Sequence, residues 1–273
     1  MKSHTKTSFT ERLAQAPLPS RQFRRNRYFY LWYDGAWAGI CLAILGLLNA
    51  VAWPGLMPGP TWWALLALPM VLYTQILGHV FVHNATHRSF SRSINRWVGE
   101  LCGFWVVTRF ASWEIVHQRH HAHADDPEND PHPVVPNFWV FTWNTLVNVE
   151  TQLQRAYYER FGDTQPTRRY ERMRAAVSFL VGGLVLVTWL QIWGGFGFFA
   201  VFLPAALLAG LHVVHFNWST HNGFSSEEDY FPVNLDHGVY WLGNRMLFGI
   251  YYHANHHKRP GLFNPMHLEH RTG

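Results

Sequence analysis

The chain has 273 residues, of which 14% are charged and 16% are aromatic. Soluble domains usually carry about 25% charged residues, so this composition disfavours an ordinary soluble protein. The formal net charge of +5 comes from clustered basic residues, as between Arg21 and Arg27. Beside apolar segments such a cluster is typical of the cytoplasmic side of a membrane, and we expect no nucleic-acid partner. The two cysteines, Cys41 and Cys102, are too few for a disulfide framework, and we expect both to be inert core residues.

The first long apolar segment, residues 35–87, contains no Asp, Glu, Lys or Arg. A membrane-spanning helix needs roughly 20 apolar residues, so this segment is long enough for two. Turn-forming residues interrupt it, and we predict a helical hairpin with spans near 35–53 and 61–82. The 34 residues before it exceed a usual signal-peptide n-region, which disfavours cleavage after Ala52. The interrupting residues are Pro54, Gly55, Pro58, Gly59 and Pro60.

Two shorter apolar patterns lie in the middle of the chain. Residues 98–108 are too short to cross a membrane, and we expect a re-entrant or interfacial helix there. After Pro136, apolar residues recur at helical spacing. This pattern predicts an amphipathic helix that either lies on the cytoplasmic face or packs within the domain. Its apolar positions are Trp139, Trp143, Leu146, Val149, Leu153 and Ala156.

A second charge-free segment covers residues 175–226. Gly194, Gly195 and Gly197 interrupt it, and we predict a second hairpin with spans near 176–193 and 197–216. Charge-free runs of this length have no polar face to offer water, which excludes a soluble helical core. All 22 Lys and Arg lie outside the two hairpins. The positive-inside rule therefore places both termini and the middle segment in the cytoplasm.

These patterns predict an all-α integral membrane protein with four transmembrane helices in two hairpins and a cytoplasmic helical cap. We expect one membrane domain over residues 1–273. Its expected parts are a cytoplasmic N-terminal segment at 1–34, four spans within 35–216 with a cytoplasmic insert at about 83–174, and a cytoplasmic C-terminal segment at 217–273.

The 18 histidines outnumber the 17 acidic residues, and many of them cluster at the expected cytoplasmic helix ends. An HxxxH motif runs from His83 to His87, and HxxHH motifs begin at His117 and at His253. Residues three and four apart share one face of a helix, so each motif directs its imidazoles toward one point. Three such motifs, all at one side of the expected membrane, predict a metal site.

A fourth element, from Asn217 to His221, ends the last predicted span. With His221, the motifs supply nine histidines, too many for a single tetrahedral zinc. Nine imidazoles suffice for two metals and leave positions open for dioxygen or water. Imidazole suits iron, copper, nickel and zinc, so the ligands alone do not choose the metal.

The order and spacing of these motifs resemble those of the membrane fatty acid desaturases and their hydroxylase and carotenoid-ketolase relatives. The resemblance covers roughly residues 60–260 and includes the loop that ends in Asp130, Pro131 and His132. It implies two iron ions per chain, with dioxygen as co-substrate. Asn217 matches a position that contacts the site through its amide. The implied iron ligands are His83, His87, His117, His120, His121, His221, His253, His256 and His257.

We expect other roles for the polar residues that lie outside the histidine motifs. The histidines within the expected spans either orient ligands or form interhelical hydrogen bonds. These are His79, His212 and His215. We expect four further histidines to be solvated or structural: His123, His132, His267 and His270. We expect the acidic residues after the second motif to form an ordinary polar loop, with ligand tuning or donor docking as the alternative. These are Asp125, Asp126, Glu128 and Asp130.

The resemblance implies removal of hydrogen from an unactivated C–H bond, which no side chain achieves unaided. The sequence has no GxGxxG motif after a strand, no phosphate-binding loop and no CxxCH haem motif. The electrons must then come from a separate donor, such as a ferredoxin, a rubredoxin or a cytochrome b5-like protein. The candidate docking residues for that donor are Arg168, Arg169, Arg172 and Arg174.

We expect a lipid substrate, with desaturation of a fatty acyl chain as the favoured reaction. The loop ending at His132 and the element ending at His221 resemble the desaturase branch. The length of 273 residues is closer to the carotenoid ketolases and hydroxylases, so oxygenation of a lipid or carotenoid is the main alternative. A metal transporter is a remote alternative, because transporters place ligands and acidic residues near the bilayer midplane. A metal-dependent hydrolase would need fewer ligands and a carboxylate base.

Overall fold

The computed structural model describes residues 18–221 and 232–268. Every regular element within these two ranges is a helix, and one isolated β-bridge joins Asn234 to Tyr252. The predicted all-α class is therefore confirmed. In chain order the helices are α2 (Leu18–Arg25), α3 (Phe29–Ala50), α4 (Trp63–Thr86), α5 (Asn95–Trp105), α6 (Phe110–His123), α7 (Phe138–Phe161), α8 (Gln165–Gly197), η1 (Phe198–Phe202), α9 (Leu203–His221), α10 (Gly238–Met246), α11 (His253–Lys258) and η2 (Pro265–His267).

Three helical runs in the described ranges are long and apolar enough to cross a membrane. They are Phe29–Ala50, Ala64–Thr86 and Gln165–His221. The first two match the predicted first hairpin, although α3 begins earlier than the predicted span and includes the carboxylate of Asp34. The third run has 57 residues and contains both predicted spans of the second hairpin. It is more than twice the roughly 20 residues that one crossing requires.

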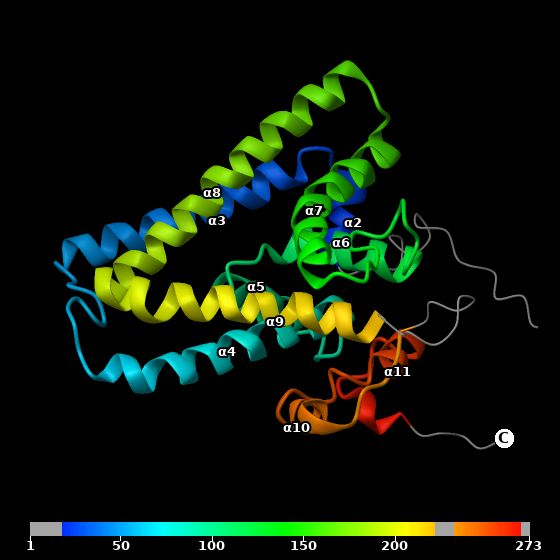
Figure 1. The fold of residues 1–273 in the computed structure, drawn as a ribbon. Coiled ribbons are helices and arrows are strands. Elements are labelled where there is room, and N and C mark those ends of the chain that lie inside the picture. The colour runs from blue at the N-terminus through cyan, green and yellow to red at the C-terminus, as the bar shows by residue number, and fades with distance from the viewer. Residues whose placement is uncertain (1–17, 222–231, 269–273) are drawn as a thin grey trace, which may run out of the picture.

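The third run changes direction at Gly194. This residue has φ 74° and ψ 165°, a conformation that interrupts the helix and favours glycine. Figure 1 shows α8 and α9 as the two arms of a V that meet at this turn. Helix α8 packs along α3, whereas α9 packs along α4. Of the three glycines predicted to break the apolar segment, Gly194 does so, whereas Gly197 keeps a helical conformation.

The turn after α3 packs directly against the turn at Gly194. The amide of Leu56 donates a hydrogen bond of 2.9 Å to the carbonyl of Ile192. A Cβ placed on Gly55, which has φ 97°, would lie 2.4 Å from the Gly194 Cα. Two backbones approach this closely only where both residues lack a side chain. The absence of a side chain at both positions therefore allows the two hairpin tips to pack together.

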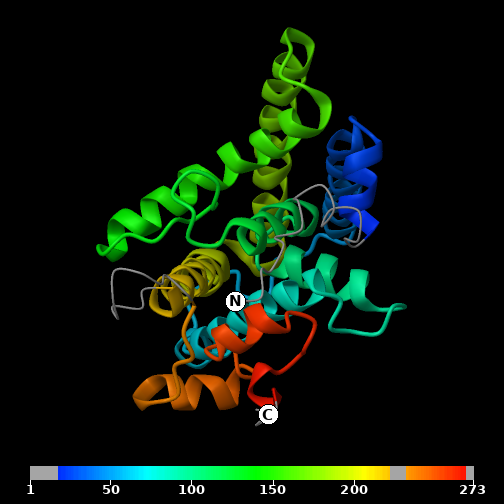
Figure 2. The same ribbon diagram turned by 90° about the vertical axis from the view of Figure 1, so that its right-hand side faces the viewer.

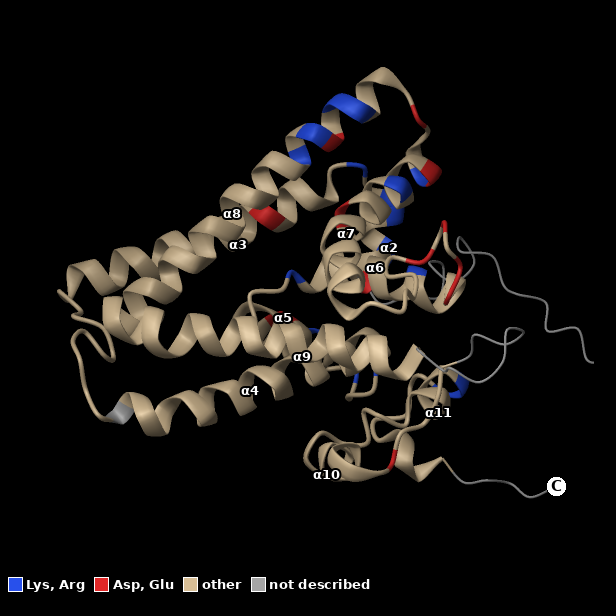
Figure 3. Cartoon of the chain, in the orientation of Figure 1, with Lys and Arg blue, Asp and Glu red and all other residues tan. Residues whose placement is uncertain are grey.

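The shorter helices gather at the opposite end of the long helices, as Figures 1 and 2 show. Helix α5 packs on α4, and α6 packs against α2 and α7. The charged residues lie at this end in Figure 3, whereas both hairpin tips carry none. The fold therefore separates an uncharged end from a charged end.

Both shorter apolar patterns form helices. Residues 98–108 fall mostly in α5, and the pattern after Pro136 forms α7. In the first half of α7 the side chains of Trp143 and Leu146 are exposed, whereas Leu153 in the second half is buried. Packing within the domain thus holds for the second half, whereas the first half buries Phe141 and presents its other apolar face to the exterior.

Buried charges join the long helices at the charged end. Arg109 lies 2.7 Å from Asp34, whose carboxylate also accepts a hydrogen bond from Ser178 on α8. Arg174 is fully buried and pairs with Glu171 at 2.9 Å. The prediction that Arg174 helps to dock an electron donor is therefore wrong, because its guanidinium does not reach the surface. Both cysteines are free; Cys41 is buried, as predicted for a core residue, whereas Cys102 is only half-buried.

Candidate metal centre

Nine of the ten residues predicted to contact metal converge at the charged end of the fold. They come from the C-terminal end of α4, from α6, from the last residue of α9 and from α11. Their ring nitrogens form two groups, and within each group the ligand atoms lie within 4.8 Å of one another. The five-histidine group comprises His83, His87, His117, His121 and His256. The four-histidine group comprises His120, His221, His253 and His257.

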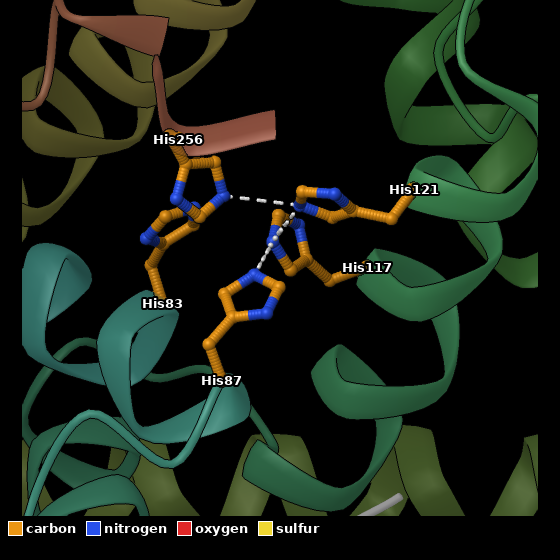
Figure 4. A group of neighbouring side chains, drawn as sticks. All are labelled: His83, His87, His117, His121 and His256. Atoms are coloured by element: carbon orange, nitrogen blue, oxygen red, sulfur yellow. Dashed lines mark hydrogen bonds between the residues drawn. The ribbon is translucent and has the colours of Figure 1, made fainter. Parts of the chain in front are cut away.

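In the five-histidine group the side chains point toward a common centre (Figure 4). The Nε2 atoms of His87 and His117 lie 2.8 Å apart, and that of His121 lies 3.1 Å from His117. His256, from α11, brings its Nε2 to 3.0 Å from that of His121. Three helices that are far apart in the sequence therefore deliver their ring nitrogens to one place.

In the four-histidine group the ring nitrogens also lie close together. The Nε2 atoms of His221 and His253 lie 3.0 Å apart, and that of His257 lies 3.2 Å from His253. His120 completes the group, with its ring centroid 4.8 Å from that of His221. All four side chains are withdrawn from bulk solvent, with His257 the most accessible.

The HxxHH spacing explains how two groups arise from so few helices. On α6, His117 and His121 are four residues apart and share a face, and both join the five-histidine group. His120, three residues after His117 and one before His121, joins the other group. Helix α11 reverses this division, since His253 and His257 join the four-histidine group while His256 joins the five. Each HxxHH motif therefore serves both groups.

The chemistry of these nitrogens fits a metal better than a hydrogen-bond network. Neutral imidazole has one donor and one acceptor, so several Nε2 atoms that face one another cannot all be paired. Burial lowers the pKa of His117, His121 and His256, and neighbouring histidines lower it further. The neutral form is the one that binds metal. Within the two groups, four buried ring nitrogens have no hydrogen-bond partner among the described residues: His83 Nε2, His120 Nε2, His253 Nδ1 and His256 Nδ1.

Two carboxylates from the loop after α6 hold histidines of the four-histidine group. Nδ1 of His120 lies 3.0 Å from each oxygen of Asp130, and Nδ1 of His221 lies 3.0 Å from Asp125. A carboxylate at Nδ1 fixes the tautomer and directs Nε2 toward the metal position. Burial raises the pKa of Asp130, but His120 and His132 lower it more, so the carboxylate stays charged.

The prediction of an ordinary polar loop is therefore wrong for Asp125 and Asp130. It holds for Asp126, whose carboxylate accepts a backbone hydrogen bond of 2.9 Å from Glu128 within the loop. Spacing alone gave no sign of which acidic residue turns inward.

His132 is buried rather than solvated. Its ring centroid lies 4.2 Å from that of His120, and its Nδ1 lies 3.6 Å from Asp130. Burial, helped by His120, lowers the pKa of His132 to about 3. The solvated interpretation is therefore wrong for this residue, and the structural one fits its contacts. His267 is exposed, as expected, and His123 is partly exposed. His270 lies outside the described residues.

Asn217, the tenth predicted residue, lies beside the five-histidine group. Its amide donates a hydrogen bond of 2.9 Å to the Val213 carbonyl on its own helix. It lines a cavity of about 20 Å³ together with His83 and His117, at the edge of the five-histidine group. His79 and His212 line the same cavity.

The histidines within the long helices make different contacts. Nε2 of His212 lies 3.0 Å from the hydroxyl of Tyr251, which favours the hydrogen-bonding interpretation for this residue. His215 contacts aromatic rings instead, with its centroid 5.8 Å from that of Phe138. Neither histidine belongs to the two groups.

Arg119 is a supporting residue that the sequence analysis missed. It is buried on α6, between His117 and His120. Its Nε donates to Gln152 at 2.6 Å, and its terminal nitrogens donate to Glu159 at 2.8 and 2.9 Å. Both partners lie on α7, so Arg119 fixes α6 against that helix. The sequence contains one sign of this role, an arginine that stands inside a histidine motif.

These features define a class of protein: a helical chain with membrane-length apolar helices and a histidine-rich candidate metal centre at one end. The chain belongs to the fatty acid desaturase family, since the family model for fatty acid desaturases matches residues 60–264. This confirms the resemblance that the histidine motifs carry.

Three curated relatives are similar over part of their length. The sn-1 oleoyl-lipid 12-desaturase of Arthrospira platensis is 32% identical over 117 residues, which are 41% of this chain and 30% of the relative. The enzyme of the same name from Picosynechococcus sp. is 30% identical over 35% of this chain and 27% of its own. That from Anabaena variabilis is 31% identical over 44% and 33%. The match therefore spans no more than about a third of these relatives. No solved structure matches the chain significantly.

Proposed function

We propose that the protein is a membrane-bound di-iron oxidoreductase that uses dioxygen to desaturate a lipid-linked fatty acyl chain. The family match supports this proposal, and so does the partial likeness to proteins named as lipid 12-desaturases. The observation that carries it is the division of nine histidines, six of them buried and three half-buried, into groups of five and four. Two such groups suit two metals of the kind that imidazole binds, and the family implies iron.

The proposed iron ligands are the two groups of histidines, with Asn217 at the edge of the five-histidine group. When bound, the irons supply the oxidising power that removal of hydrogen from an unactivated C–H bond requires. The chain's own residues hold the ligands in place. Asp125 and Asp130 fix the tautomers of His221 and His120, and Arg119 anchors α6. The complete set is His83, His87, His117, His120, His121, Asn217, His221, His253, His256 and His257.

A separate electron donor is part of the proposal, in the form of a ferredoxin, a rubredoxin or a cytochrome b5-like protein. Exposed arginines near the start of α8 remain candidates for docking it. Arg168 is exposed and pairs with Asp163 at 2.6 Å, so its charge is partly compensated. Arg169 and Arg172 are exposed on the same helix.

We also propose that the chain is one membrane domain with four spans and that both termini and the metal centre lie in the cytoplasm. The reversal at Gly194 and the charged end of the fold support this arrangement. Reporter fusions after residues 57 and 195 should report the outer compartment, and fusions near residues 130 and 265 the inner one. An inner signal at either tip would contradict the topology.

Lipid analysis by mass spectrometry tests the reaction. Cells that produce the protein together with an electron donor should accumulate lipids that have lost two hydrogens relative to cells with an empty vector. Lipids that gain oxygen and lose no hydrogen would instead assign the chain to the hydroxylase or ketolase branch. Purified protein should consume dioxygen only when the donor and lipid are both present. A metal transporter or a hydrolase would consume none.

A further inference from the structure

A basic cavity lies beside the metal centre but does not belong to it. It has a volume of about 500 Å³ and lies where α2, the loop after α4, α5 and α6 meet. None of the described residues that line it is acidic. Four of its lining residues are arginines: Arg21, Arg88, Arg92 and Arg96.

Three of the guanidinium groups, those of Arg21, Arg88 and Arg92, are close enough to influence one another. Burial lowers the pKa of Arg88, and the positive charges of Arg21 and Arg92 lower it further. Arg96 lies 3.6 Å from Glu100, a carboxylate that also accepts a hydrogen bond of 2.7 Å from Tyr33. Glu100 and Glu114, which also interacts with Arg88, are two acidic residues against four arginines and offset only part of this positive charge. The cavity therefore attracts an anion.

An apolar groove adjoins the basic cavity. It has a volume of about 570 Å³ and lies between α3 and α5. Arg96 lines both spaces and marks the point where they meet. Trp97 and Leu101 on α5 line the groove and are 65% and 61% exposed, so this face is apolar and open. Its other lining residues include Trp37, Ile40 and Ile44 of α3, together with Glu100, whose carboxylate contacts Arg96 and Tyr33.

We propose that the cavity and the groove together bind one anionic glycerophospholipid. The arginines hold the headgroup phosphate, and one acyl chain lies in the groove between α3 and α5. Guanidinium groups recognise phosphate through paired hydrogen bonds, and the adjoining apolar groove matches the chain attached to it. A free phosphate would use only the first of these spaces. The proposal rests on the proposed membrane topology and is independent of the reaction.

Native mass spectrometry of the purified protein tests this proposal. The probes are phosphatidylglycerol and phosphatidylcholine with the same acyl chains, and inorganic phosphate as competitor. The wild-type protein should bind one phosphatidylglycerol more tightly than phosphatidylcholine. The double variant Arg21→Gln/Arg92→Gln should bind it roughly 30-fold more weakly, which corresponds to about 2 kcal/mol at about 1 kcal/mol for each arginine. Ile44→Trp, which fills the groove, should weaken both lipids.

The matched control is Arg169→Gln/Arg172→Gln, which removes the same charge from exposed positions on α8. It should leave lipid binding within about twofold of the wild type. Equal binding of the two lipids by the wild type would overturn the proposal, as would equal weakening by the control. Complete displacement of the lipid by millimolar phosphate would show that the cavity binds a free anion instead. Circular dichroism confirms that each variant is folded.

Discussion

Both carboxylate oxygens of Asp130 lie 3.0 Å from Nδ1 of His120, and both side chains are buried. This contact leaves Nε2 of His120 to face the four-histidine group. Replacing Asp130 by Asn removes the charge and allows the imidazole to turn. We expect the affinity for the metal of that group to fall roughly 10- to 100-fold, as is usual when a supporting carboxylate is lost.

Metal titration followed by elemental analysis measures this change. Asp126→Asn is the matched control, because Asp126 lies in the same loop and its carboxylate accepts hydrogen bonds from Glu128 and Asn129 of that loop. Asp130→Asn should also lower the metal content of the purified protein. Equal metal content in both variants would mean that Asp130 does not support a ligand.

Single histidines separate the proposed ligands from the others. His256→Ala removes a ring from the five-histidine group, so activity should fall by more than the roughly 100-fold that loss of a supporting residue costs. His267→Ala changes an exposed residue of η2 and should leave activity and metal content near those of the wild type. Iron content and lipid desaturation measure the two effects. Comparable losses in both variants would show that the ligands are assigned wrongly.

Removing one partner of the ion pair between Asp34 and Arg109 should cost more stability than removing both. Arg109→Gln leaves the buried carboxylate of Asp34 without its counter-charge, and such a change costs about 3–5 kcal/mol. The double variant Asp34→Asn/Arg109→Gln removes both charges and should recover much of that loss. Arg168→Gln breaks a fully exposed pair and should change the melting temperature far less. Thermal unfolding in detergent ranks these variants, and no recovery in the double variant would contradict the argument.

The buried carboxyl of Glu114 should make the stability of the wild-type protein depend on pH. It is fully buried on α6, and its two carboxylate oxygens have no hydrogen-bond partner among the described residues. Burial raises its pKa well above the usual value, and the charge of Glu100 raises it further. The folded state therefore favours the protonated form. That contribution is complete below the unfolded pKa of about 4.3 and is lost as the pH rises through the folded pKa.

Glu114→Gln removes this titration and keeps the shape of the side chain. The variant should therefore gain stability relative to the wild type as the pH rises from about 5 to about 9. Melting temperatures of both proteins across this range measure the difference. A difference that stays constant with pH would show that Glu114 does not titrate in the folded protein.

The sequence was most informative where chemistry depends on spacing. Histidines three and four residues apart predicted the convergence of nine rings, because helix geometry fixes which residues share a face. The division into groups of five and four was not predictable, since it depends on how α6 and α11 face each other. The roles of Asp125 and Asp130 also depend on the path of a loop, which spacing does not determine.

The fold shows the same contrast. Long charge-free segments predicted the apolar helices, and turn-forming residues predicted where they break. The predicted first span starts later than α3, because the prediction placed Asp34 outside the membrane helix. In the structure Arg109, which is distant in the sequence, pairs with that carboxylate and allows α3 to include it. A tertiary partner of this kind leaves no local pattern.

The contact between Gly55 and Gly194 fixes one end of the long helices, so a small rotation there would displace the other end by a much larger distance. Helix α4 has 24 residues, which at 1.5 Å per residue gives an arm of roughly 36 Å between the hairpin tip and His83 and His87. A rotation of roughly 2° at the tip would move those rings by about 1 Å, and displacements of that size can cost about 100-fold in rate. Gly194→Ala should therefore lower activity although it lies far from the histidines.

Gly195→Ala is its control, because a Cβ at that position meets no atom within 4 Å. Helix content by circular dichroism should be the same in both variants, and lipid desaturation should differ. Equal activities would mean that the tips do not set the geometry of the site. Unequal activities would mean that two glycines at the opposite end of the protein help to set the geometry of the candidate metal centre.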